Sequence, residues 1–77
     1  MSAYRVTFLR KLRNLRGEPV QAEYRAIGIQ LARDPERAVA AAKKRFARLE
    51  GVTHWRLRAD YVDIDEIAAE GFVYGSA

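Results

Sequence analysis

The chain has 77 residues, of which 49% are hydrophobic and 31% charged, and it carries a net charge of +4. This length suits one small domain, so we expect residues 1–77 to form a single domain with a limited core. Because the chain has no cysteine, disulfides, thiolate catalysis and Cys-ligated zinc are excluded. No apolar run approaches the roughly 20 residues of a membrane span, and we expect a cytoplasmic protein without membrane contact.

Two early segments have the two-residue period of β-strands. In residues 4–9 apolar and polar side chains alternate, which predicts a half-buried strand. A second strand is predicted in residues 20–31. Its apolar face comprises Ile27, Ile29 and Leu31. Between the strands a Leu-Arg-x triplet occurs three times in residues 9–17, ahead of the turn signal at Glu18 and Pro19. A loop, a helical turn and an extended hairpin are all compatible with this segment.

The strongest local signal is that of a helix, with start, period and stop in agreement. Asp34 is suited to cap the helix, Pro35 to occupy its first turn and Glu36 to complement the positive end of its dipole. Gly51 supplies a left-handed residue at the end. The spacing therefore predicts a helix between residues 34 and 51. Its apolar face is expected to comprise Ala38, Val39, Ala42, Phe46 and Leu49.

A third strand is predicted in residues 54–64, where apolar and charged side chains again alternate. The alternation changes phase near Val62, which indicates a bulge or a strand that leaves the sheet. Residues 65–70 are interpreted as a helical turn. Most of this turn falls within residues 66–77, which are interpreted as a flexible C-terminal tail.

These elements have the order ββαβ and predict an α+β fold. A right-handed crossover from the second strand through the helix to the third leaves room for the first strand between them. We therefore expect a three-stranded antiparallel sheet of order 2-1-3, with one helix packed on one face. The predicted register pairs Phe8 with Leu57 on one side and with Ile27 on the other. Both pairings put the same face of the first strand beneath the helix.

The residues needed for catalysis or for a cofactor are missing. His54 is the single histidine, and the chain has no cysteine. A nucleophile, a base and a group that orients the base therefore cannot be assembled from the usual residues. The glycines are isolated and resemble no phosphate-binding loop. The carboxylates of residues 60–66 lack the glycine and the spacing of a calcium loop. We expect no enzyme, no cofactor and no metal site.

The charge is distributed unevenly along the chain. All fourteen Lys and Arg lie at or before Arg58, with only five acids among them, whereas residues 59–77 carry five acids and no base. The predicted topology gathers many of these cations at one pole, where the first strand and the helix end. Such a pole is typical of a surface that binds nucleic acid through phosphates, without regard to sequence, although a solvated basic face is the alternative. The predicted nucleic-acid-binding residues are Arg10, Lys11, Arg13, Arg16, Lys44, Arg45, Arg48 and Arg56. The opposite pole is expected to hold Asp34, Glu36, Asp60, Asp63 and Asp65.

The uncovered face of the sheet is a second candidate surface, because an aromatic ring among arginines is able to stack on a base. The alternative hypothesis is a protein–protein interaction or homodimerisation module, since self-association through a sheet edge or this face would enlarge a small core. The residues expected to project from the face are Arg5, Tyr24, Gln30, Arg56 and Arg58.

Overall fold

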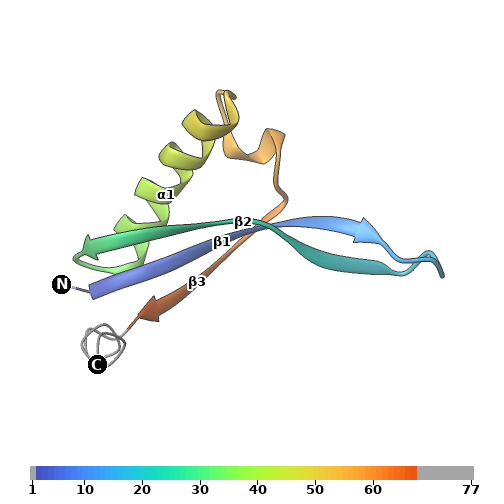
Figure 1. Ribbon diagram of the computed structural model, residues 1–77, viewed down its shortest axis with the longest axis horizontal. Helices are drawn as coiled ribbons and strands as arrows, with labels where there is room; N and C mark the ends of the chain where they lie inside the picture. Colours follow the sequence, from blue (N-terminus) through green and yellow to red (C-terminus); the bar gives the residue numbers. More distant parts are fainter. Residues whose placement is uncertain (1, 68–77) are drawn as a thin grey trace, which may run out of the picture.

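The computed structural model describes residues 2–67. Its elements are β1 (Ser2–Arg13), β2 (Pro19–Ala32), α1 (Pro35–Glu50), the 3-10 helix η1 (Trp55–Leu57) and β3 (Tyr61–Ile67). The strands form one antiparallel sheet in the order β2-β1-β3, and α1 lies on one of its faces (Figure 1). The predicted α+β fold and strand order are confirmed. Among the described residues, α1 is neither long nor apolar enough to cross a bilayer.

Both ends of α1 follow the sequence signals. The Asp34 carboxylate accepts a hydrogen bond of 2.8 Å from the backbone N–H of Arg37, as an N-cap does. At the other end Gly51 has a φ of 69°, and its N–H together with that of Val52 donates to the last turn in a Schellman motif. Leu49 is 56% exposed, so its predicted place on the buried face is wrong.

The core lies between α1 and the covered face of the sheet. The rings of Phe8 and Phe46 stack with centroids 4.0 Å apart and an angle of 13°, and Trp55 meets Phe8 edge-on at 5.8 Å. Both phenylalanines are fully buried. The other buried apolar residues are Tyr4, Val6, Ile27, Ile29, Ala32, Ala38, Ala42 and Ala59.

The third strand begins later than predicted. Residues 55–57 form η1, whose start is capped by His54, because the Nδ1 of His54 accepts a hydrogen bond from the N–H of Arg56. The alternation at the start of the predicted strand therefore comes from a tight turn that buries Trp55 and Ala59. β3 starts at Tyr61, so Phe8 pairs with Val62 rather than with Leu57.

β3 also extends further than the prediction allowed. Asp65, Glu66 and Ile67 belong to the strand, which contradicts the helical turn and the tail at these positions. The remainder of the predicted tail lies outside the described residues.

The register of β2 differs from the prediction, and two irregularities interrupt its alternation. Val6 pairs with Ile27, and Phe8 pairs with Arg25. The next pair joins Leu9 to Glu23, which leaves Tyr24 as an extra residue in a bulge. A second irregularity near the end of β2 leaves Leu31 70% exposed and Ala32 buried, so the prediction that Leu31 belongs to the apolar face is wrong.

Candidate nucleic-acid interface

The Leu-Arg-x segment is an extended hairpin that projects from the sheet (Figure 1). β3 pairs with β1 only as far as Leu9, and four further pairs, from Arg10 with Ala22 to Arg13 with Pro19, join β1 to β2 alone. We call residues 10–22 the arm. The four pairs extend roughly 14 Å along the strands. Every residue of the arm is exposed except Ala22, which is half-buried.

The turn at the end of the arm is fixed by Asn14. Its Oδ1 accepts hydrogen bonds from the N–H groups of Arg16 at 2.9 Å and of Glu18 at 3.0 Å. Its carbonyl accepts from the N–H of Gly17, which has a φ of 81° and so occupies the left-handed region. The guanidinium of Arg13 donates to the Gly17 carbonyl at 2.7 Å. The tip is therefore a defined turn and not a loose loop.

The arm carries four cations and one acid. Because side chains alternate along a strand, Arg10 and Leu12 project to the side of α1, whereas Lys11 and Arg13 project to the other side. The guanidinium of Arg10 lies 5.6 Å from the centre of the Tyr24 ring. The cations are Arg10, Lys11, Arg13 and Arg16, and the acid is Glu18.

One carboxylate connects α1 to the base of the arm. The Glu50 side chain is only 9% exposed, and it accepts a hydrogen bond of 2.7 Å from the Tyr24 hydroxyl and forms an ion pair of 2.9 Å with Arg25. The Nε of Arg58 lies 3.9 Å away. The hydrogen bond from Tyr24 and the nearby arginines hold the pKa of Glu50 below its ordinary value against the opposing effect of burial, and the same hydrogen bond raises the pKa of Tyr24.

The contacts of this cluster correct the prediction for the open face. Tyr24 and Arg58 were expected there, but both contact Glu50, and the Tyr24 ring packs edge-on against Phe46 at 5.9 Å. For Tyr24 the bulge is the cause, because an extra residue in one strand interrupts the alternation of faces. Arg58 follows η1 and precedes β3, so it belongs to no strand of the sheet. Sequence periodicity could not predict this cluster, because Glu50 contacts Tyr24 and Arg25, which are distant from it in the chain.

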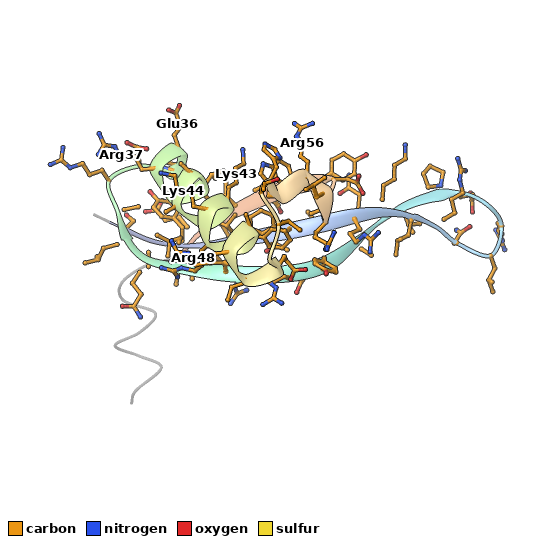
Figure 2. The ribbon with its side chains drawn as sticks, turned by 90° about the horizontal axis from the view of Figure 1, so that it is seen from above. Glu36, Arg37, Lys43, Lys44, Arg48 and Arg56 are labelled. Atoms are coloured by element: carbon orange, nitrogen blue, oxygen red, sulfur yellow. The ribbon has the colours of Figure 1, made fainter. Side chains whose placement is uncertain are left out.

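The other predicted site residues lie on the helix layer. Lys44 and Arg48 are exposed on α1, whereas the guanidinium of Arg45 donates to the Gly28 carbonyl of β2 at 3.0 Å. Arg56 belongs to η1 and lies 5.1 Å from the centre of the Trp55 ring, so its predicted place on the open face is also wrong. In Figure 2 Arg56 lies closer to the arm than Arg37, which is at the opposite end of the molecule.

Lys43 was not predicted. Its Nζ lies 5.1 Å from the centre of the same Trp55 ring that Arg56 contacts. The sequence could have indicated its position, because Lys43 lies three residues before Phe46 in the helix and therefore beside the buried face.

The predicted acidic pole also needs a correction. Asp60 lies at the base of the arm, where its carboxylate accepts a hydrogen bond of 2.8 Å from the N–H of Lys11 and its own N–H donates to the Leu9 carbonyl. Its position follows from the late start of β3. Asp34 lies at the N-terminus of α1, away from the arm. Within residues 2–67 no group of three acidic or histidine side chains is arranged to hold a metal ion.

The sheet face opposite α1 has no covering layer among the described residues (Figure 1). A hollow of about 680 Å³ lies over part of this face, and its lining includes Arg5, Gly28, Leu31 and Ile67. Arg5 is paired across the sheet with Asp65, which lowers the net charge of the face. Comparison of the chain with known protein families, with curated proteins and with solved structures finds no match.

Proposed function

We propose that the protein binds nucleic acid through phosphate contacts made by the arm, without regard to base sequence. One observation carries the proposal: four cations and a single acid stand on a two-stranded ribbon that neither α1 nor β3 covers. Guanidinium and ammonium groups bind phosphates and release their counterions, which favours association with any nucleic-acid strand.

The needs of the fold account for only part of this charge. Arg13 supports the turn and Arg10 lies over Tyr24, but among residues 2–67 the side chains of Lys11 and Arg16 have no hydrogen bond or ion pair. An uncovered ribbon needs charges that prevent pairing with other strands. Acids would meet that need as well as bases do. The predominance of one sign is what favours a polyanion as the partner.

The cations of the helix layer provide a second contact region in this proposal. Lys44 and Arg48 are exposed on α1 and Arg56 is exposed on η1, and of these three Arg56 lies nearest the arm (Figure 2). Arg48 also lies in the last turn of α1, where a cation stabilises the helix dipole. We therefore assign the larger share of binding to the arm.

The test compares two double variants with the same loss of charge. Lys11→Gln with Arg16→Gln removes two cations from the arm, and Arg33→Gln with Arg37→Gln removes two from the opposite end. Fluorescence anisotropy on a labelled duplex and a labelled RNA is measured at about 50 and about 200 mM salt. The arm variant should weaken binding to all sequences together and reduce the salt slope by roughly two units.

The control variant should bind like the wild type, because its cations lie away from the arm. Undetectable binding near 50 mM salt would contradict the proposal. Equal weakening by the two variants would show that net charge, and not the arm, governs association.

A second candidate function is homodimerisation through the sheet face opposite α1. The observation that favours it is the apolar hollow on that face, which the exposed Leu31 helps to line. Sedimentation equilibrium over a range of concentrations tests this candidate, with Gly28→Glu as the variant that places a charge in the hollow. A monomer mass at all concentrations, or a dimer that Gly28→Glu leaves intact, would refute it.

A further inference from the structure

The tip of the arm presents one apolar side chain to solvent. Leu15 has a relative accessible surface of 107%, the highest among the exposed large apolar residues that the structure describes. It occupies a corner of the Asn14–Gly17 turn, and no side chain of residues 2–67 covers it. The fold therefore gains nothing from burial of a leucine at this position.

The turn holds Leu15 in place instead of letting it fold back. The hydrogen bonds to Asn14 and the left-handed Gly17 define the backbone on both sides of Leu15. Because the backbone is fixed, little conformational freedom remains to be lost when the side chain meets a partner. Leu15 is thus an apolar projection held by a defined turn at the end of the arm.

Charge surrounds this projection. Arg16 follows it directly, and Arg13 donates to the carbonyl of Gly17 in the same turn. A leucine that arginines flank in the chain matches a surface where phosphates flank an apolar interior, which is the cross-section of a DNA groove. Apolar side chains of this size are known to enter between base pairs from the minor groove and to bend the duplex.

We propose that Leu15 inserts between adjacent base pairs of duplex DNA and bends it, while Arg13 and Arg16 contact the phosphates on either side. The inference rests on the proposed function and narrows it from nucleic acid in general to duplex DNA. A step that unstacks readily, such as TpA, is the preferred insertion point, because the energy needed to deform it is lower.

An anionic membrane offers the same combination of phosphates and an apolar interior, but a single leucine supplies little insertion energy. Stable anchoring of a peripheral protein needs either a long apolar face or two separate signals. The described arm has one apolar residue at its tip, so the duplex is the better match. Vesicle binding is therefore included as a competing outcome.

The experiment uses a short duplex with a central TpA step, 2-aminopurine beside that step and a donor and acceptor dye at its two ends. With wild-type protein, 2-aminopurine fluorescence should rise as the base unstacks, and energy transfer should increase as the ends approach. Leu15→Ala should abolish both signals. It should change affinity by less than about tenfold, because the apolar burial gained by the leucine is largely offset by the unstacking of the step.

Two further variants make the result specific. Leu15→Ile keeps an apolar group of similar volume at the tip and should retain both signals. Leu49→Ala makes the same chemical change at another exposed leucine, near the C-terminus of α1, and should behave like the wild type. Thermal melting checks that each variant is folded.

The outcomes separate this inference from the function on which it rests. If the wild type binds the duplex with a steep salt dependence but neither signal appears, or if Leu15→Ala still gives both, the insertion of Leu15 is refuted and phosphate binding stands. Absence of any binding refutes both. Binding to vesicles of phosphatidylserine and phosphatidylcholine that Leu15→Ala abolishes, without unstacking of DNA, would replace the duplex with a membrane surface.

Discussion

Phe46 is the residue whose loss should damage the fold most. It is fully buried, stacked on Phe8 at 4.0 Å and in edge contact with Tyr24 at 5.9 Å. Replacement of such a phenylalanine by alanine costs about 3–5 kcal/mol, from lost burial and from the cavity that remains. The whole free energy of unfolding of a chain of this length is roughly 4–12 kcal/mol. Phe46→Ala should therefore remove a large part of the stability.

Urea titration measures this loss directly. Trp55 is the single tryptophan, is buried and contacts Phe8, so its fluorescence reports on the core. With a slope of about 1 kcal/mol per molar urea, typical of a small protein, the midpoint should fall by about 3–5 M or the variant should be unfolded without urea.

The control is Leu49→Ala, three residues further along α1 at a position that is 56% exposed. It should change the free energy of unfolding by no more than about 0.5 kcal/mol. A loss of less than about 1 kcal/mol in Phe46→Ala, or an equal loss in the control, would refute the assignment of the buried face of α1.

Three other predictions concern local features. The folded-state pKa of Glu50 lies below its ordinary value of 4.5. The stabilising contribution of the Glu50 carboxylate is therefore complete above pH 4.5 and is lost as the pH falls through the lower folded-state pKa. The urea midpoints of the wild type and of Glu50→Gln should converge as the solution is acidified below pH 4.5. Gly51→Ala should lower the free energy of unfolding by about 1–2 kcal/mol, because the alanine must adopt a left-handed conformation. Gly28 has a negative φ and open space around it, so Gly28→Ala should leave the melting temperature unchanged. Asp34→Ala should lower the free energy of unfolding by about 1 kcal/mol, because the N-cap hydrogen bond is lost. Asp34→Asn should lower it by only a small part of that amount, and thermal melting measures both variants.

The helix and the strand order were predictable because their signals are local. Asp34 and Gly51 fix the limits of α1 by interactions within a few residues. The face on which Tyr24 lies was not predictable, because its contacts with Phe46 and Glu50 join residues that are distant in the chain. The start of the third strand was misplaced because a tight turn also alternates buried and exposed residues.

The candidate site shows the same division. The arm's cations were evident in the triplets, but their arrangement was left open among three alternatives. Asn14 and Gly17 carried the missing signal, since an asparagine followed three residues later by a glycine is typical of a turn that closes a hairpin. The cation–π contacts of Trp55 and the ion pairs of Glu50 arise only from tertiary structure.

The position of β1 in the centre of the sheet has a consequence for the order of folding. Its pairing with β2 closes only a short turn. By contrast, the hydrogen bond of Lys11 to Asp60, the residue just before β3, joins residues 49 apart in sequence. Loop closure on that scale is slower than hairpin formation, so we expect the hairpin to form first and β3 to join last. Until then one edge of β1 is unpaired. Arg5 and Lys11 lie along that edge, and their charges discourage its pairing with another chain during synthesis.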